Sequence, residues 1–131
     1  MKMNSQNHDW SGRTILVAED VPTNYMLIEA VLSSTKVNLI WARNGQEAVE
    51  KCLDNEKIDL VLMDIQMPVM NGMEATRTIL KKRNSLPIIG QTAFTFNYEE
   101  ENIMKAGCRR VLTKPISPDT LLSCISDYFT V

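Results

Sequence analysis

The stretch "LVLMDIQMPVMNG", residues 60–72, joins a short apolar run to an acid, a proline and a glycine. Residues 60–63 are apolar at consecutive positions, which is typical of a parallel strand covered on both faces. The run stops at Asp64, and a carboxylate is costly to place at the end of a buried strand unless it has a partner or a function. The stretch therefore predicts a buried strand whose last position carries a carboxylate.

Similar runs recur along the chain: "TILVA" (14–18), "VNLIWA" (37–42), "IDLVLM" (58–63), "LPIIGQ" (86–91) and "RRVLT" (109–113). The segments between them have helical spacing. In three of these segments, apolar residues recur on one helix face. These residues are Leu27, Ala30 and Val31 in the first segment, Ala48, Val49, Cys52 and Leu53 in the second, and Leu121, Leu122, Ile125, Tyr128 and Phe129 in the last. About five strand–helix units predict an α/β three-layer sandwich, a parallel sheet with helices on both faces.

Capping signals mark the helix starts. Asn44, Asn71 and Asn97 each precede a glutamate by three positions, which fits an asparagine cap with an acid in the first turn. Ser117-Pro118 is expected to open the last helix. Gly107 is expected to end the fourth helix in a left-handed conformation.

The bulk composition favours one globular domain, which we expect at 13–131, after an N-terminal linker or expression tail at 1–12. The chain has 131 residues and a net charge of −2, so no direct contact with nucleic acid is expected. The cationic run 81–83 is expected to be the solvated last turn of a helix. No apolar stretch is long enough to cross a bilayer. Three scattered cysteines indicate reduced, buried thiols in the cytoplasm.

The expected strand ends carry a set of polar side chains. Glu19-Asp20 follow the first strand, Asp64 the third, Thr92 the fourth and Lys114-Pro115 the fifth. Ligands of open parallel sheets bind beyond the carboxyl ends of the strands. Three acids, one hydroxyl and one amine are therefore expected to share a single rim.

Clustered carboxylates repel one another, and a divalent cation removes that repulsion. Oxygen ligands with waters describe a site for Mg²⁺ (or Mn²⁺). A carboxylate can then attack phosphorus and hold the phosphoryl group as a mixed anhydride. Lys114 would pair with a phosphoryl oxygen and Thr92 would donate to another. Asp64 is thus expected to be phosphorylated.

Each of these residues also has an ordinary structural explanation. Asp64 could cap the following helix, Glu19-Asp20 could form an acidic loop, and Lys114 could be a solvated lysine before a turn proline. Thr92 could be a β-branched residue at the core edge. For the functional interpretation to be wrong, all of these structural explanations would have to be true at once. The shared position of the residues at strand ends argues against that coincidence.

Over residues 14–129 the chain resembles the receiver domain of two-component signalling. The resemblance is carried by "ILVAED" (15–20), "LVLMDIQMPVMNG" (60–72), "PIIGQTA" (87–93) and "VLTKPI" (111–116). With "WSGRTIL" at the entry, the chain is most similar to receivers of hybrid sensor histidine kinases. The resemblance implies a flavodoxin-like (βα)5 fold with strand order 2-1-3-4-5.

By position in these motifs, the resemblance implies roles around a metal. Asp64 would be the phosphoacceptor and Asp20 a direct Mg²⁺ ligand. Glu19 would act beside Asp20 or through water, and Gln66 would offer its backbone carbonyl. The phosphoryl group would come from a histidine kinase or a histidine phosphotransfer domain, in a separate protein or in the same parent polypeptide. The chain would then catalyse its own phosphorylation and slow dephosphorylation.

The resemblance also implies switch and lifetime positions. Thr92 would be the switch hydroxyl, and Pro115 would follow Lys114 in a loop where a cis peptide is usual. Val111 stands where the family often has an aromatic ring, so it cannot signal by ring rotation. Phe94 and Gln66 stand where the family tunes water access to the phosphoryl group.

Three rival functions differ in class. The chain could be a receiver-like interaction module that is not phosphorylated. It could be a phosphatase with an aspartate nucleophile, but Gln66 occupies the place where those commonly have a second aspartate. It could carry a flavin, but the first loop, "EDVPTN", is acidic and lacks the glycines of a phosphate cradle.

Overall fold

The computed structural model describes residues 8–93 and 97–129, and the side chains of Asn97 and Tyr98 lie outside that description. Its centre is a parallel sheet of five strands in the order β2-β1-β3-β4-β5. The strands are β1 (Thr14–Ala18), β2 (Asn38–Ala42), β3 (Leu60–Asp64), β4 (Ile88–Thr92) and β5 (Arg110–Thr113). The expected flavodoxin-like α/β fold and strand order are confirmed.

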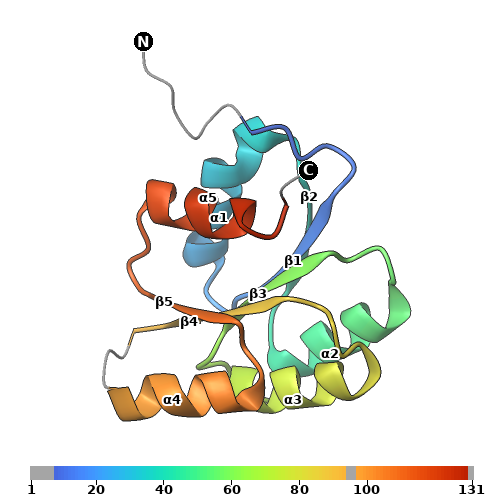
Figure 1. Ribbon diagram of the computed structural model, residues 1–131, viewed down its shortest axis with the longest axis vertical. Helices are drawn as coiled ribbons and strands as arrows, with labels where there is room; N and C mark the ends of the chain where they lie inside the picture. Colours follow the sequence, from blue (N-terminus) through green and yellow to red (C-terminus); the bar gives the residue numbers. More distant parts are fainter. Residues whose placement is uncertain (1–7, 94–96, 130–131) are drawn as a thin grey trace.

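Helices cover both faces of this sheet (Figure 1). They are α1 (Pro22–Leu32), α2 (Gly45–Asp54), α3 (Gly72–Lys82), α4 (Asn97–Ala106) and α5 (Pro118–Ser126), with a 3₁₀ turn, η2 (Ser33–Thr35), after α1. The core beneath α1 and α5 includes Val17 and Ile89, and the core beneath α2, α3 and α4 includes Leu16 and Ile88. Consecutive strand residues thus enter opposite cores, which explains why the strands are apolar without alternation.

The third and fourth strands end at the candidate rim, as expected: β3 ends on Asp64 and β4 ends on Thr92. Asp64 pairs with Gln91 at the end of the parallel ladder. Both candidate residues are therefore held by strand hydrogen bonds.

Helix α1 buries a different face from the one expected. Leu27, Ala30 and Val31 do share a face, but Leu27 is 66 % exposed and Ala30 is exposed too. The buried residues of α1 are Tyr25, Ile28 and Leu32. Helix α1 is apolar on more than one face, so spacing alone could not choose between them. The expectation for Leu53 in α2 is wrong in the same way, since it is 39 % exposed.

The expected caps are confirmed at three helices. The side chains of Asn44, Asn71 and Ser117 accept hydrogen bonds from the backbone N–H groups of Glu47, Glu74 and Thr120, respectively. Asn97 is the first residue of α4, and its expected capping contact lies outside the described residues. Gly107 ends α4 with a φ of 121°.

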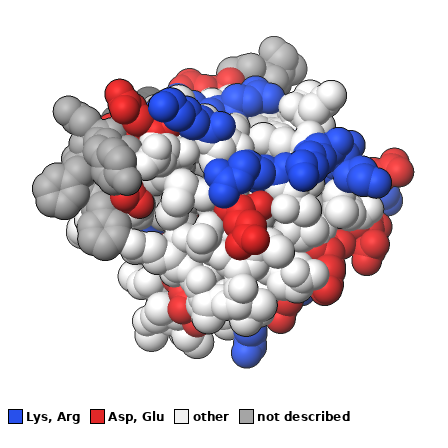
Figure 2. Space-filling view, turned by 90° about the horizontal axis from the view of Figure 1, so that it is seen from below, with Lys and Arg blue, Asp and Glu red and all other residues white. Residues whose placement is uncertain are grey.

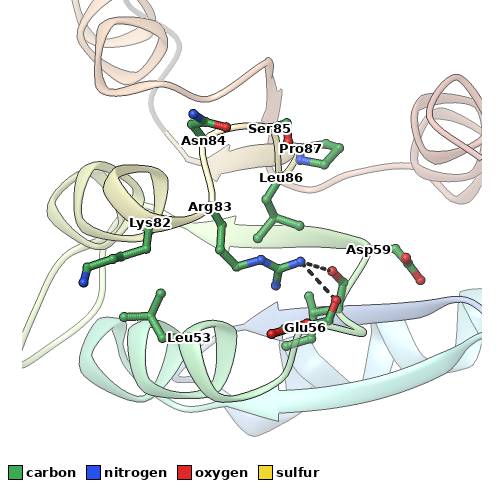
Figure 3. A pocket seen from close by; sticks show the side chains of 10 residues that line it. Leu53, Glu56, Asp59, Lys82, Arg83, Asn84, Ser85, Leu86 and Pro87 are labelled. Carbon is green, nitrogen blue, oxygen red and sulfur yellow. Dashed lines mark hydrogen bonds between the residues drawn. The ribbon is translucent and has the colours of Figure 1, made fainter.

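The face formed by α2, α3 and α4 carries a band of lysines and arginines (Figure 2). Lys81 and Lys82 are exposed in the last turn of α3, as expected. Arg83 differs, because its guanidinium donates to the backbone carbonyls of Cys52, Asn55, Glu56 and Ile58. Figure 3 shows Arg83 among the residues that line a hollow there. The hollow around it, of about 760 Å³, lies at the amino ends of β3 and β4, away from the candidate rim. Arg83 therefore ties the loop after α2 to the end of α3.

The residues before β1 pack on the end of α5. Trp10 is 5 % exposed, its backbone N–H donates to Thr35 O at 2.7 Å, and its ring meets that of Phe129 edge-on at 5.4 Å. His8 stacks on Trp10 at 4.8 Å. The boundary expected between a linker at 1–12 and a domain at 13–131 stays a prediction, and Trp10 is the residue with which to test it.

The three cysteines are free and buried, as expected. Burial raises the pKa of Cys52 to about 12 and that of Cys108 to about 11, so both thiols stay protonated at neutral pH. Among the described residues, every helix is too short or too polar to cross a membrane.

Candidate functional site

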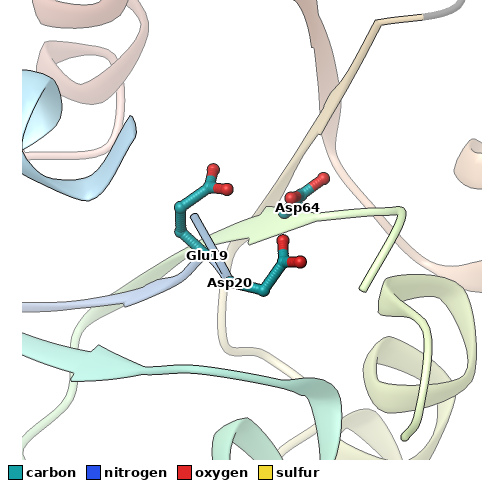
Figure 4. A group of neighbouring side chains, drawn as sticks. All are labelled: Glu19, Asp20 and Asp64. Atoms are coloured by element: carbon teal, nitrogen blue, oxygen red, sulfur yellow. The ribbon is translucent and has the colours of Figure 1, made fainter. Parts of the chain in front are cut away.

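Three carboxylates meet at the carboxyl ends of β1 and β3 (Figure 4). Glu19, Asp20 and Asp64 each offer an oxygen, and these oxygens lie within 4.8 Å of one another. Glu19 and Asp64 are buried, whereas Asp20 is half-buried. The parallel sheet brings them together, because β1 and β3 are neighbours that end at the same edge. The expected convergence of the three acids is thus observed.

Lys114 bridges two of these acids. Its Nζ lies 3.2 Å from Glu19 Oε1 and 3.2 Å from Asp64 Oδ2. The lysine follows β5, and its backbone N–H donates to Thr92 O at 2.8 Å, which holds the residue against the end of β4. The side chain is 24 % exposed, so the amine is near solvent but faces the acids. A cation in this position partly offsets the cost of burying two carboxylates.

Backbone and amide donors fix the orientation of Glu19. Its Oε2 accepts from the N–H of Val21 at 3.3 Å and from Asn24 Nδ2 at 3.4 Å. Its backbone carbonyl accepts from Trp41 Nε1 at 2.8 Å. The Trp41 ring stacks on Tyr25 of α1 at 4.4 Å, so the start of α1 and the end of β2 hold the loop after β1 in place.

The pKa of the Asp64 carboxyl is raised to about 6. Burial is the largest cause and the nearby Glu19 carboxylate also raises this pKa, while Lys114 and the Gln66 N–H act in the opposite direction. The Gln66 N–H donates to Asp64 Oδ1 at 3.1 Å. The carboxylate is thus poised near neutral pH, as functional groups often are.

A tight turn and a glycine bring α3 against the end of β3. The Gly72 N–H donates to Ile65 O at 2.9 Å. A Cβ atom at Gly72 would lie 2.3 Å from Asp64 O, so no larger residue fits without displacing backbone. Within the same turn Val69 has a φ of 71° and is 80 % exposed. The "MPVMNG" segment therefore shapes the wall beside Asp64.

Thr92, Pro115 and Gln66 lie on or beside this rim, whereas Val111 lies within β5, where it pairs with Gly90 of β4. Thr92 is 1 % exposed at the end of β4, and the Lys114–Pro115 peptide is cis, as the resemblance implied. Gln66 is exposed, and Val111 is half-buried against the core under α4. Phe94 lies outside the described residues.

The residues present fit a hard divalent cation. Glu19, Asp20 and Asp64 supply carboxylate oxygens only, which is the donor type that Mg²⁺ and Mn²⁺ prefer. The partial exposure of Asp20 leaves room for water ligands on its side of the cluster. Lys114 neutralises part of the negative charge, which lowers the demand for a second cation.

Sequence reasoning missed Gln91, which pairs with Asp64 in the ladder. The residue is 2 % exposed, and in the part of the chain that the structure describes its Nε2 atom has no hydrogen-bond partner. The available signal was an amide at the end of the apolar run "LPIIGQ". Only the fold reveals that this amide is buried.

A family model described as the response regulator receiver domain matches residues 15–126. Among curated proteins, the chain is similar to the polar-differentiation response regulator DivK of Brucella anthropi. The two are 31 % identical over 118 residues, which cover 88 % of this chain and 95 % of DivK.

Solved structures of receiver domains also match this chain. The receiver domain of the sensor histidine kinase PA1611 from Pseudomonas aeruginosa PAO1, with a magnesium ion in its active-site cleft, matches with a TM-score of 0.85 and 32 % identity, covering 92 % of this chain and all of that one (100 %). A chain of the complex between the Saccharomyces cerevisiae phosphotransfer protein Ypd1 and the receiver domain of Ssk1 matches with a TM-score of 0.83 and 27 % identity, covering 91 % of this chain and 90 % of that one.

Proposed function

This chain belongs to the response regulator receiver domain family. We propose that it accepts a phosphoryl group on Asp64 and switches conformation to relay a two-component signal. One observation carries the assignment to Asp64. Asp64 is buried at the end of β3, its pKa is raised to about 6, and the Lys114 amine lies 3.2 Å from its Oδ2 atom. Glu19 also contacts Lys114, but its other oxygen is held by two donors at the start of α1.

The chemical step follows from this placement. An Asp64 carboxylate oxygen attacks phosphorus, a new O–P bond forms, and the N–P bond of a phosphohistidine breaks. The imidazole nitrogen leaves with the electron pair of that bond. Lys114 pairs with a phosphoryl oxygen as its contact with the carboxylate is replaced, and the Thr92 hydroxyl donates to another. The protein thus provides both the acceptor and the groups that stabilise the transferred charge.

Glu19, Asp20 and Asp64, with the backbone carbonyl of Gln66, would hold Mg²⁺ (or Mn²⁺). When bound, such a cation neutralises the charge of the carboxylates and of the incoming phosphoryl oxygens. We assign to Asp20 a direct contact with the cation. Glu19 would contact the cation through a water molecule. The engagement of Glu19 with Lys114, Val21 and Asn24 supports that division.

The phosphodonor is a histidine kinase or a histidine phosphotransfer domain, in a separate protein or in the same parent polypeptide. Complex formation between Ypd1 and the Ssk1 receiver supports this class of partner. Helix α1 begins two positions after Asp20 and exposes Met26 and Leu27, which are 59 % and 66 % exposed. We place the donor's contact there, beside the site. The free, protonated cysteines support a reducing, cytoplasmic location.

The switch positions remain proposals from the sequence. Thr92, buried at the end of β4, would follow the phosphoryl group and move the loop behind it. Val111 has no ring to rotate, so the signal would pass mainly through Thr92 and α4. Gln66 and Phe94 would set the access of water to the phosphoryl group. A faster decay of phospho-Asp64 in Phe94→Ala than in the native protein is the expected result.

Intact mass after incubation with acetyl phosphate and Mg²⁺ tests the assignment of the acceptor. The native protein should gain one phosphoryl group, and Asp64→Asn should gain none. Lys105→Ala, which changes an exposed lysine of α4, should behave like the native protein. If the native protein gains nothing while remaining folded, the chain is a receiver-like interaction module instead.

A further inference from the structure

The carboxylate of Asp20 reaches the rim without an anchor of its own. One of its oxygens lies within 4.8 Å of oxygens of Glu19 and Asp64, and its side chain turns toward Asp64 (Figure 4). Lys114 pairs with both of those acids, and the Gln66 N–H donates to Asp64. In the part of the chain that the structure describes, no group donates a hydrogen bond to the Asp20 carboxylate or pairs with it. The backbone therefore sets the position of this carboxylate.

One hydrogen bond fixes the peptide unit that leads into Asp20. This unit contains the carbonyl of Glu19, which accepts from Trp41 Nε1 at 2.8 Å. The other contacts of Glu19 act elsewhere, because its N–H donates to Ala42 O at 2.9 Å and its carboxylate is held by separate donors. A peptide unit is planar, so a donor that orients the Glu19 carbonyl also orients the Asp20 nitrogen at the other end of that unit.

The fold holds the Trp41 ring where it can donate to this carbonyl. Trp41 lies in β2, next to β1, and is half-buried. Its ring stacks on Tyr25 of α1, with centroids 4.4 Å apart and planes 6° from parallel, and the guanidinium carbon of Arg43 lies 4.4 Å from the Trp41 centroid. Both contacts favour one ring orientation. Since an indole N–H can only donate, the held ring presents a fixed donor to the loop after β1.

We propose that Trp41 is a positioning residue for the cation site, whose N–H holds the peptide between Glu19 and Asp20 so that the Asp20 carboxylate reaches the other acids. The inference rests on the proposed function, in which these acids hold Mg²⁺, and adds to it a residue of β2 outside the acid cluster. Without this N–H the peptide adopts other orientations as well. A smaller fraction of molecules then has all three acids in place, and the apparent affinity for the cation falls by that fraction.

Trp41→Phe tests this role, because a phenyl ring keeps the stack on Tyr25 and lacks the N–H. Calorimetric titration of Mg²⁺ into the protein should give a Kd about threefold to tenfold higher for Trp41→Phe than for the native protein, as expected for the loss of one neutral hydrogen bond. Trp10→Phe is the matched control. It changes a tryptophan that precedes β1, at the end opposite Glu19, and it should bind Mg²⁺ like the native protein.

The rate of phosphorylation by acetyl phosphate separates positioning from general damage. At Mg²⁺ concentrations below its Kd, Trp41→Phe should react more slowly than the native protein. At saturating Mg²⁺ it should approach the native rate, because only the affinity for the cation has changed. A merely structural disturbance would lower the rate at every Mg²⁺ concentration.

NMR spectra of the indole N–H groups give a readout that does not require Trp41→Phe to fold. The chain has two tryptophans, so Trp10→Phe identifies the signal that remains as that of Trp41. Mg²⁺ should shift the Trp41 signal more than the Trp10 signal, because only Trp41 is bonded to the loop that carries the acids.

The proposal is overturned if Trp41→Phe binds Mg²⁺ as tightly as the native protein, if its rate stays low at saturating Mg²⁺, or if the Trp41 signal does not move. These results would leave the proposed function standing. A native protein that binds no Mg²⁺ would overturn the cation site, and this inference with it.

Discussion

The amine of Lys114 lies 3.2 Å from Asp64 Oδ2, at the ends of two strands that are not neighbours in the sheet. The lysine side chain extends across the end of β4, and its backbone N–H donates a hydrogen bond to Thr92 O there. The same amine also contacts Glu19, so one cation stands between two buried acids. This arrangement leads to specific expectations for single substitutions.

Removing the amine should leave Asp64 and Glu19 facing each other without a cation. Because Lys114 lowers the pKa of Asp64, Lys114→Ala should raise that pKa further above 6. The rate of phosphorylation by acetyl phosphate should fall on the order of 10²-fold or more, since a charge-stabilising group is lost. Lys105→Ala is the matched control. A variant that is phosphorylated at the native rate would contradict the assigned role.

The buried acid makes stability depend on pH. The folded-state pKa of Asp64, about 6, lies above its ordinary value of 3.8. The folded form therefore binds a proton more tightly than the unfolded form, so this contribution to stability is complete below pH 3.8 and is lost as the pH rises through 6. Without Mg²⁺, Asp64→Asn should be more stable than the native protein at pH 7.5, by up to about 3 kcal/mol.

Thermal unfolding of both proteins between pH 4.5 and pH 7.5 measures this effect. The difference in Tm should shrink as the pH falls. Adding Mg²⁺ at pH 7.5 should raise the Tm of the native protein and have a smaller effect on Asp64→Asn. A difference in Tm that is independent of pH would show that Asp64 is not the group that titrates.

Gly72 should tolerate no side chain. A Cβ atom there would meet Asp64 O at 2.3 Å and Ile65 Cα at 2.8 Å, and both are backbone atoms that cannot move alone. Gly72→Ala should lower the free energy of unfolding by about 2 kcal/mol and slow phosphorylation, because the end of β3 shifts. Gly90→Ala is the comparison, because the nearest atoms to its Cβ belong to side chains, with Ile103 Cγ2 at 2.9 Å, and none belongs to the backbone. Urea unfolding should rank Gly72→Ala as the more damaging.

The exposed apolar face of α1 should affect the rate of phosphorylation only when the phosphodonor is a protein. Leu27→Glu puts a charge on that face and should reduce phosphotransfer from a phosphorylated histidine phosphotransfer domain roughly tenfold. Phosphorylation by acetyl phosphate, which needs no docking surface, should be unchanged. Leu53→Glu, which changes an exposed residue of α2, should affect neither phosphotransfer from the protein donor nor phosphorylation by acetyl phosphate. Equal losses with both donors would mean that Leu27 acts on the site and not on docking.

Trp10 tests where the folded unit begins. Its ring is buried against Phe129, so Trp10→Ala should cost about 3 kcal/mol of stability, as truncations of large buried aromatic residues do. His8→Ala, which removes only the stacked outer ring, should cost under about 1 kcal/mol. A Trp10 variant as stable as the native protein would support residues 1–12 as a linker.

The positions of the strands and the chemistry of the rim could be predicted from local patterns. A parallel sheet requires apolar runs without alternation, and its strands end at one edge. The polar residues at those ends could therefore be placed together from the sequence: Glu19, Asp20, Asp64, Thr92 and Lys114. The caps at Asn44, Asn71 and Ser117 were equally local, because a side chain that bonds to a backbone N–H three positions on needs no distant partner.

Sequence by itself thus determined which residues form the sheet and which polar groups gather at its end. Only the tertiary structure decided which face of α1 is buried, that Lys114 bridges two acids at once, and that Gln91 Nε2 is buried without a partner among the described residues. The physical reason is the range of the interactions. Periodicity and capping act over a few positions, whereas burial and ion pairing depend on what other strands and helices bring into contact.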